Sequence, residues 1–404
     1  MINSAGRVEI SWLPFLVIGR LARLSVLPPP SPALPMKFQI PFHRVDWINT
    51  VFLFGVTLLA LIAAPWYLIV HGLDPILWGL FAFYVLATGL SITLGYHRLF
   101  SHLSFKAKWP VRFFTLVFGA CAFENSALNW CSDHRRHHKH TDHEDDPYDI
   151  SKGFLWAHIG WILFKLNPEP PMDNVADLRK DKLVMWQYRW DKLLAVVVGL
   201  LLPTVLGYYL AGGWVGALGG FLIVGALRVF VVQQCTFFIN SLCHTIGSQP
   251  YSTKCSARDS WIMALFTFGE GYHNFHHEFQ HDYRNGVKAW NWDPTKWLIW
   301  VLSKLGLVSD LRRVPANKIL LAEMAEARRQ VDARLTEIRE TETTVCARAM
   351  EAVHELVEKL GQNYQDLETA MAERVEVARH VIEQWRRETR ELMDRLGDLK
   401  PLPA

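Results

Sequence analysis

The sequence ILWGLFAFYVLATGLSITLGYHRLFSH, residues Ile76–His102, decides the fold. Its apolar first part, Ile76–Leu94, is long enough to cross a hydrocarbon core of roughly 30 Å. The whole stretch Ile76–His102 contains no charged side chain before Arg98, and that arginine lies between two histidines, His97 and His102. A membrane-spanning helix that ends in a pair of histidines predicts a helical bundle with a polar site at one end.

Three further apolar runs have the length and composition of membrane spans. Trp47–Val70 comes first, and the short turn His71–Pro75 joins it to the run at Ile76. Leu193–Leu210 and Trp214–Ile239 form a second pair around the turn Ala211–Gly213. We therefore predict an all-α, multi-pass membrane protein with four transmembrane helices in two hairpins.

A further apolar segment, residues 111–128, is interrupted by Glu124 and Asn125. We expect an interfacial or buried helix there rather than a fifth span. With four spans, every histidine cluster falls on one side of the membrane. The Lys and Arg residues of this side lie in the long segments 97–112, 135–192 and 254–329. By the positive-inside tendency this side is the cytoplasm, so the sequence predicts a cytoplasmic helical cap in a membrane like the bacterial inner membrane.

Histidines gather more densely than packing requires. His273, His276 and His277 share one helix face through their i, i+3, i+4 spacing, and residues 134–138 repeat that spacing. The candidate ligands are His97, His102, His134, His137, His138, His244, His273, His276 and His277, with Asn240 one helical turn before His244. Neutral imidazole is the commonest protein ligand of transition metals, and nine imidazoles exceed what one ion can hold. The pattern predicts a site for two metal ions.

Acidic residues near these stretches are candidates to orient the ligands, as carboxylates do in many metal sites. They are Asp133, Asp142, Glu144, Asp145, Asp146 and Glu270. Four other histidines lie off the spacing and are expected to make ordinary hydrogen bonds: His140, His143, His158 and His281. One alternative remains, because His277–His281 reads HEFQH and fits the His-Glu-x-x-His signature of zinc proteases. That interpretation leaves the first two histidine stretches unexplained.

The two ends of the chain differ from its middle. Residues 1–35 read as an N-terminal leader or proline-rich linker, and Met36 is an alternative start. Residues 316–404 are rich in Glu, Arg and Ala, and apolar residues recur there at three- and four-residue steps. After a membrane domain of residues 40–310 we expect a charged amphipathic helical arm or coiled coil. It is either an oligomerisation or partner-docking arm or a solvated helix. The net charge of +3 is too small to indicate a nucleic-acid partner.

The chain resembles the integral-membrane fatty acyl-CoA desaturases of the stearoyl-CoA Δ9 type over residues 40–310. The matching motifs are His97-Arg-Leu-Phe-Ser-His102, Asp133-His-Arg-Arg-His-His138, Gly153–Trp161, Asn240-Ser-Leu-Cys-His244, Gly269–His277 and Asp282–Gly286. Ser132 stands where animal members carry Arg, and the C-terminal arm has no counterpart in animal members. The resemblance implies two irons held by the nine histidines, with Asn240 acting through water. It also implies that Asn125, Asp133 and Lys165 contact the thioester carrier of the substrate.

The implied reaction is insertion of a cis double bond into a saturated acyl-CoA or acyl-lipid chain with O2 and two electrons. The chain shows no haem, iron–sulfur, flavin or cytochrome b5-like pattern. The electrons are therefore expected from an external donor, such as a ferredoxin, a rubredoxin or a cytochrome b5-type protein with its reductase. An alkyl hydroxylase of the same di-iron class is the alternative within this chemistry.

Overall fold

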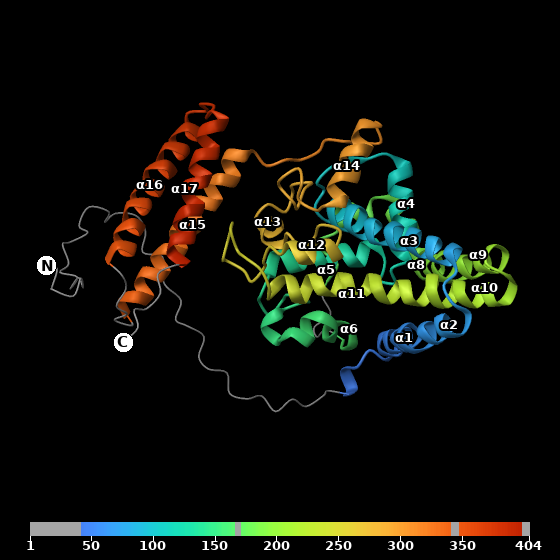
Figure 1. Ribbon diagram of the computed structural model, residues 1–404. Helices are drawn as coiled ribbons and strands as arrows, with labels where there is room; N and C mark the ends of the chain where they lie inside the picture. Colours follow the sequence, from blue (N-terminus) through green and yellow to red (C-terminus); the bar gives the residue numbers. More distant parts are fainter. Residues whose placement is uncertain (1–41, 166–170, 341–346, 398–404) are drawn as a thin grey trace. The chain divides into compact units, whose positions relative to one another are not determined.

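The computed structural model describes residues 42–165, 171–340 and 347–397 (Figure 1). This part of the chain forms two compact units: the first spans Arg44–Glu326, and the second contains the residues from Ala327 on together with Phe42 and His43. The first unit contains four helices long and apolar enough to cross a membrane: Trp47–His71, Pro75–Ser101, Lys182–Leu210 and Gly213–His244. The predicted all-α, multi-pass architecture is confirmed. The predicted leader, residues 1–35, lies outside the described residues.

Each of the four spans contains a π-helical stretch, in which backbone hydrogen bonds run between residues five apart. The first span comprises α1 (Trp47–Leu58), η2 (Leu59–Ala63) and α2 (Ala64–His71), and the second α3 (Pro75–Leu90) and η3 (Ser91–Ser101). The third comprises α8 (Lys182–Val196), η6 (Val197–Leu201) and α9 (Leu202–Leu210). The fourth comprises α10 (Gly213–Gly219), η7 (Gly220–Leu227), α11 (Arg228–Ser241) and the 3-10 turn η8 (Leu242–His244).

Two of these π-helical stretches lie directly before a proline inside a span. Pro65 follows η2 and Pro203 follows η6. Proline lacks the N–H that would bond the preceding turn and crowds its carbonyl, and a widened turn accommodates both effects. Pro203 therefore does not interrupt the third span. The helix that contains this span begins at Lys182, before the apolar run at Leu193, and the Asp181 carboxylate caps the polar first half of α8.

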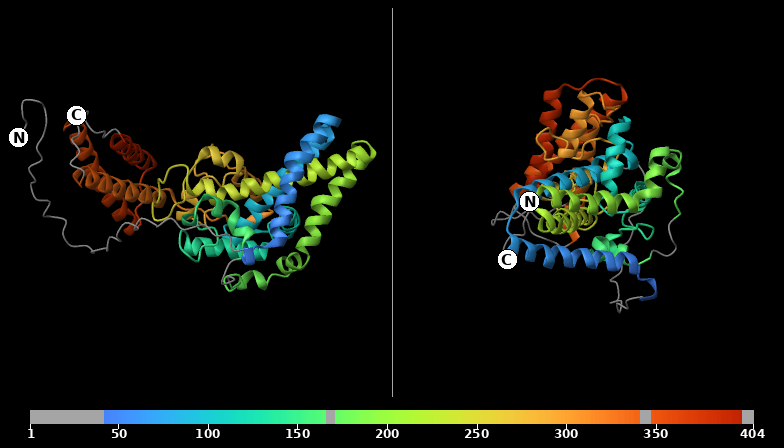
Figure 2. Two further views of the ribbon diagram at one scale, coloured as in Figure 1. Left: turned by 90° about the horizontal axis from the view of Figure 1, so that it is seen from below. Right: turned by 90° about the vertical axis from the view of Figure 1, so that its right-hand side faces the viewer.

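Short elements make up the rest of the first unit, and most lie around the histidine-bearing end of the bundle. Its helices are η1 (Phe42–Arg44), α4 (Trp109–Ala120), α5 (Ala127–His140), η4 (Ile150–Lys152), η5 (Trp156–Gly160), α6 (Trp161–Leu163), α7 (Ala176–Arg179), α12 (Trp261–Phe266), α13 (His273–Glu278) and α14 (Pro294–Lys304). Two short strands, β1 (Lys106–Ala107) and β2 (Val308–Ser309), pair antiparallel. The spans run away from this group (Figure 2). Among the described residues α4 is not one of the membrane-capable helices, which agrees with the prediction that residues 111–128 do not form a fifth span.

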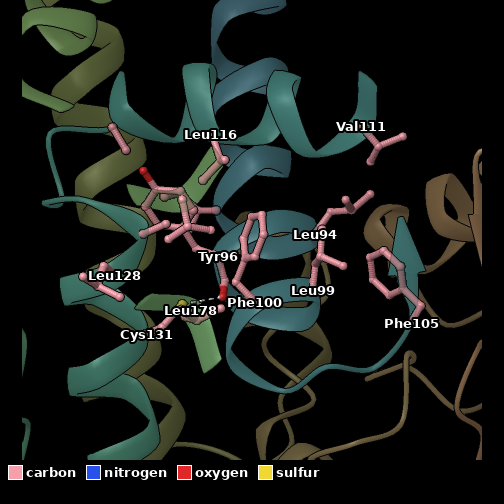
Figure 3. Close-up of a cluster of buried hydrophobic side chains, with 14 of the residues drawn as sticks. Leu94, Tyr96, Leu99, Phe100, Phe105, Val111, Leu116, Leu128, Cys131 and Leu178 are labelled. Atoms are coloured by element: carbon pink, nitrogen blue, oxygen red, sulfur yellow. Dashed lines mark hydrogen bonds between the residues drawn. The ribbon is translucent and has the colours of Figure 1, made fainter. Parts of the chain in front are cut away.

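An apolar cluster holds α4 and α5 against η3 (Figure 3). Its labelled members include Leu94, Tyr96, Leu99, Leu116 and Leu128. Tyr96 is fully buried, and its hydroxyl accepts a hydrogen bond from Gln187 Nε2 at 2.7 Å. The Cys131 thiol of α5 donates to the Tyr96 carbonyl. Because Tyr96 precedes His97 directly, this packing fixes the backbone that carries the first two histidines.

The C-terminal helices are α15 (Ala316–Glu340), α16 (Ala347–Ala372) and α17 (Arg379–Gly397), and α15 begins within the first unit. α16 and α17 pack against each other (Figure 1), and Asn363 Nδ2 donates to Glu388 Oε2 at 2.7 Å. Gly361 lies inside α16, whereas the chain turns between α16 and α17, where Arg374 adopts a φ of 57°.

Candidate metal centre

Nine imidazoles from four parts of the chain converge on one buried site. They come from η3 and its end, from α5, from the end of the fourth span and from α13. They form two groups, and within each group the potential ligand atoms all lie within 4.8 Å of one another. The five-histidine group contains His97, His102, His134, His138 and His276, and the four-histidine group contains His137, His244, His273 and His277. The structure thus brings together all nine histidines that the sequence singled out.

The π-helical backbone of η3 explains how His97 and His102 reach the same group. The His102 N–H donates to the His97 carbonyl at 3.1 Å, which is a bond between residues five apart. On an α-helix of 3.6 residues per turn, side chains five apart diverge by about 140°. Here the two rings lie with their centroids 4.8 Å apart. No local pattern in the sequence announces this widened turn.

Within each group the Nε2 atoms face one another. In the five-histidine group the distances are 3.0 Å for His97–His276, 2.8 Å for His102–His134 and 3.0 Å for His276–His138. In the four-histidine group they are 3.3 Å for His137–His277, 3.1 Å for His273–His244 and 3.1 Å for His277–His273. Converging imidazole nitrogens are a donor set that suits a transition-metal ion.

Three of the histidines also meet an oxygen through the opposite ring nitrogen. The pairs are His97 Nδ1 with Glu270 Oε2 at 2.8 Å, His137 Nδ1 with Asp146 Oδ1 at 2.9 Å, and His244 Nδ1 with Ser256 Oγ at 2.7 Å. The hydrogen bonds at His137 and His244 hold the ring proton on Nδ1 and leave the Nε2 lone pair for a metal, and the Glu270 carboxylate lies where it favours the same tautomer of His97. The residues therefore fit a metal ion by their orientation as well as by their number.

Burial keeps the histidine rings in the neutral form that binds metals. Desolvation lowers the pKa of six of them well below the usual value, and the neighbouring imidazoles lower it further. These six are His102, His134, His138, His273, His276 and His277. Protonation would place several like charges within one buried cluster, which is unfavourable.

The predicted acidic partners divide into two sets. Asp146 and Glu270 contact histidines of the two groups, and Asp142 reaches His244 through Ser256, whose hydroxyl donates to Asp142 Oδ1 at 2.5 Å. The other three do not orient a ligand by any contact among the described residues. Asp133 lines a cavity, Asp145 lies 3.8 Å from His140, and the Glu144 carbonyl accepts from Lys152.

Arg98 lies beside His97 and is buried in an ion-pair network. Its guanidinium donates to Glu270 Oε1 at 2.8 Å, to Asp293 Oδ1 at 3.0 Å and to the Tyr283 carbonyl at 2.8 Å. Glu270 therefore binds Arg98 with one oxygen and His97 with the other. Burial acts to raise the pKa of Glu270, but Arg98 and His97 outweigh it and hold the pKa below its usual range.

Motif-based analysis of the sequence does not identify three residues that contact the histidines or their carboxylate partners. Ser256 and Asp293 lie in irregular segments whose sequence has no periodicity. Arg98 carries one signal that could have found it, because a charge at the end of a span usually faces a polar interior. Its buried carboxylate partners, however, lie 172 and 195 residues further along the sequence.

The remaining histidines lie outside both groups. His281 Nδ1 donates to the His102 carbonyl at 2.8 Å, and His158 lies 3.0 Å from Ser241 Oγ and 3.1 Å from Gln234 Oε1. The zinc-protease alternative requires His277 and His281 to bind the same ion. The structure instead groups His277 with three other histidines and does not bring His281 into that group.

A cavity of about 530 Å³ opens onto the five-histidine group, of which His97 and His134 line its wall. Apolar side chains on this wall include Phe52, Leu53, Ile92, Phe123 and Phe237. The three predicted substrate contacts, Asn125, Asp133 and Lys165, line the same cavity, and so does Asn240. The wall combines apolar and polar side chains in comparable numbers, and such a cavity fits a ligand that has both an apolar part and a polar part.

Glu124 is a carboxyl group on this cavity wall, where the sequence shows only an interruption of an apolar run. Its Oε2 accepts a hydrogen bond from Trp130 Nε1 at 3.3 Å. Burial raises the pKa of Glu124 to about 8, although hydrogen bonds from Thr236 and Trp130 favour the carboxylate. The side chain therefore holds a proton at neutral pH.

We expect Glu124→Gln to change how stability depends on pH. The folded protein holds the Glu124 proton up to about pH 8, whereas the unfolded chain releases it near pH 4.5. The free energy of unfolding therefore falls as pH rises between these values, by about 1.4 kcal/mol per pH unit at most, and then levels. Melting temperatures should be measured in one detergent. The melting temperature of Glu124→Gln, relative to that of the wild type, should rise from pH 5 to pH 8. A constant difference between the two would contradict this assignment.

Four membrane-capable helices that end at a buried, converging set of imidazoles define a multi-pass membrane protein with a histidine-rich site able to hold metal. The sequence pattern of the fatty acid desaturases matches residues 74–291. The chain belongs to the fatty acid desaturase family.

Named relatives agree with this assignment. The chain is 40% identical over 300 residues to acyl-CoA desaturase 1 of Saccharomyces cerevisiae, covering 73% of this chain and 57% of the yeast protein. It is 36% identical over 248 residues to human stearoyl-CoA desaturase, covering 60% of this chain and 68% of the human protein. It is 35% identical over 287 residues to stearoyl-CoA desaturase 5 of Bos taurus, covering 69% of this chain and 83% of the bovine protein. The chain spans less than two thirds of the length of two yeast relatives.

Proposed function

We propose that this protein is a fatty acyl desaturase that introduces a cis double bond, at Δ9, into a saturated acyl-CoA chain. The reaction would use O2 and two electrons from an external donor. One observation carries the proposal: a cavity with both apolar and polar wall residues reaches a buried group of neutral imidazoles. The names of the relatives, acyl-CoA and stearoyl-CoA desaturases, support the acyl-CoA substrate.

We assign the two histidine groups to two iron ions, with Asn240 acting through water. Iron bound there supplies the activation of O2 that abstraction of hydrogen from an unactivated methylene requires. No acid or base of the protein can remove such a hydrogen, because the carbon has no acidic proton. The task of the chain is to hold the ligands neutral and oriented, as Glu270, Asp146 and Ser256 do for three of them.

The cavity residues bind and orient the substrate in this proposal. Phe52, Ile92 and Phe237 offer an apolar wall to the acyl chain and exclude water from it. Asn125, Asp133 and Lys165 contact the thioester carrier. Because His97 and His134 line the same cavity, a chain that fills it passes beside the five-histidine group.

The wider setting is also part of the proposal. The histidine end of the bundle faces the cytoplasm of a membrane like the bacterial inner membrane, with lipid around the four spans. Residues 40–310 form the desaturase domain, and residues 316–404 form a charged helical arm, which is either an oligomerisation or docking arm or a solvated helix. The electron donor is a ferredoxin, a rubredoxin or a cytochrome b5-type protein with its reductase.

Two measurements test the function. The purified protein should contain about two iron ions per chain, measured by plasma mass spectrometry. Expression in a host that cannot make unsaturated fatty acids should yield cis-monounsaturated chains, measured by gas chromatography of the cellular lipids. Appearance of hydroxy fatty acids alone would replace desaturation by hydroxylation. One zinc ion per chain, with no change in lipids, would end the oxidase assignment.

A further inference from the structure

Helix α14 exposes an apolar face that the bundle does not cover. Leu298, Ile299 and Leu302 on one side of the helix pack into the apolar cluster around η3. Trp297, Trp300 and Val301 lie on another side at i, i+3 and i+4, and Trp300 is 52% exposed. Residues with this spacing form one stripe, and on a helix that faced water the stripe would be polar.

Helix α12 repeats this arrangement. Met263 and Ala264 are buried, whereas the other four residues of the helix are large, apolar and exposed. These four are Trp261, Ile262, Leu265 and Phe266, and Trp261 is 66% exposed. Exposed apolar patches of this kind mark a surface that is covered by a membrane, another protein or a ligand.

Both helices are attached to the second span near the point where it reaches the histidine site. The Thr295 hydroxyl at the start of α14 lies 2.7 Å from Thr93 Oγ1 in η3 and donates to the Phe268 carbonyl at 2.9 Å. Phe268 follows α12, and its ring packs so closely on Gly89 of α3 that no side chain would fit there. The exposed faces of α12 and α14 are therefore anchored to the last turns of a membrane-spanning helix.

Tryptophans and lysines are paired on this surface. Lys304 Nζ lies 5.5 Å from the centre of the Trp300 ring, and Lys288 Nζ lies 5.8 Å from that of Trp290, which is 78% exposed. Buried Lys296 fixes the loop that carries Trp290, since its Nζ donates to the Lys288 carbonyl at 2.8 Å. Trp favours the membrane–water boundary, where Lys can extend toward lipid phosphates while its stem stays on apolar surface.

We propose that α12, α14 and Trp290 lie in the headgroup layer of the leaflet on the histidine side, with lipid as their partner. Two arguments select lipid over a protein partner: the surface is continuous with the second span, and its Trp–Lys pairs match an interface with phosphate headgroups. The proposal does not depend on the reaction that the site performs.

This contact with lipid would also bear on the histidine site. Asp293 caps α14 by accepting from the Lys296 N–H at 2.8 Å, and its other oxygen binds Arg98 at 3.1 Å. Arg98 binds Glu270, and Glu270 binds His97. The position of α14 at the membrane would therefore be linked to the candidate ligand His97 through the buried side chains of Asp293, Arg98 and Glu270.

Photocrosslinking tests the proposal on the full chain. The photoreactive residue p-benzoylphenylalanine is placed at Trp300 or at Leu265, and the protein is held in nanodiscs of phosphatidylcholine and phosphatidylglycerol. Leu61, exposed on the first span, serves as the lipid-facing control, and Glu144, an exposed residue of the loop after α5, serves as the water-facing control. Metal content and elution volume report whether each variant is folded.

After irradiation, intact-protein mass spectrometry should find lipid adducts at Trp300 and Leu265 with yields within about threefold of Leu61, and none at Glu144. Absence of lipid adducts at both test positions in folded protein would overturn the proposal. Crosslinks to a second copy of the chain, or to another segment of the same chain, would overturn it too, because they would identify a protein partner on this surface. Absence of desaturation by the wild-type protein, with lipid adducts still found at Trp300 and Leu265, would count against the proposed function alone.

Discussion

His276→Ala is expected to abolish desaturation and to lower the iron content from about two ions per chain to about one. The Nε2 atom of His276 lies 3.0 Å from that of His97 and 3.0 Å from that of His138, so its ring stands between two other members of the five-histidine group. Removing it takes one nitrogen from the middle of the set and leaves a gap that the buried surroundings cannot fill. Loss of an outer partner alone commonly costs 10–100-fold in metal affinity or activity, so loss of a ligand should exceed roughly 100-fold.

The neighbouring His281 provides a matched control. His281→Ala removes an imidazole five residues after His276, which contacts the His102 carbonyl but belongs to neither group. Iron content and product yield should stay within about fivefold of the wild type, since an ordinary hydrogen bond contributes only about 1 kcal/mol. His137→Ala addresses the four-histidine group and should again leave about one ion. An inactive His281→Ala together with an active His137→Ala would restore the zinc-protease interpretation of His277–His281.

The parts of the fold that the sequence predicts are those governed by local chemistry. Span length and hydropathy depend on runs such as Ile76–Leu94, and helical spacing places His273, His276 and His277 on one face. Topology then follows from the even number of spans, and it requires the histidines to meet on one side. The nine candidate ligands therefore follow from residue type, spacing and topology alone.

What the sequence does not reveal depends on contacts between distant residues. The π-helix η3 arises where Tyr96 and its neighbours pack between α4 and α5, and only this turn aligns His97 with His102. Asp293 and Ser256 support the site from loops, and no spacing rule connects them with the histidines. The cavity contacts Asn125 and Lys165 followed from family resemblance, because neither residue belongs to a pattern that chemistry alone would single out.

Asp146→Asn is expected to weaken metal binding in the four-histidine group by about 10–100-fold while leaving the five-histidine group loaded. The Asp146 carboxylate lies 2.9 and 3.0 Å from His137 Nδ1 and accepts from the Tyr148 N–H at 2.9 Å and the Asp142 N–H at 3.1 Å. Burial acts to raise the pKa of Asp146, but His137 and these hydrogen bonds outweigh it and hold the pKa below its usual range. The group is thus a fixed carboxylate that keeps the His137 proton on Nδ1.

The substitution changes which nitrogen of His137 carries the proton. An asparagine can turn its amide nitrogen toward Nδ1, which then must accept a hydrogen bond, so the ring proton moves to Nε2, the atom that faces His277. A protonated Nε2 cannot bind a metal. Titration with a chelator of known affinity should therefore remove about one iron ion from Asp146→Asn under conditions in which the wild type keeps both.

The adjacent residue separates this orienting effect from a general disturbance of the loop. The Asp145 side chain is 71% exposed and lies 3.8 Å from His140, which belongs to neither group. Asp145→Asn should therefore keep its iron, and Asp146→Glu should recover part of the affinity, because it restores a carboxylate that accepts from Nδ1. Equal iron loss in the two asparagine variants, or no recovery with glutamate, would mean that Asp146 acts through the fold of the loop and not through the tautomer of His137.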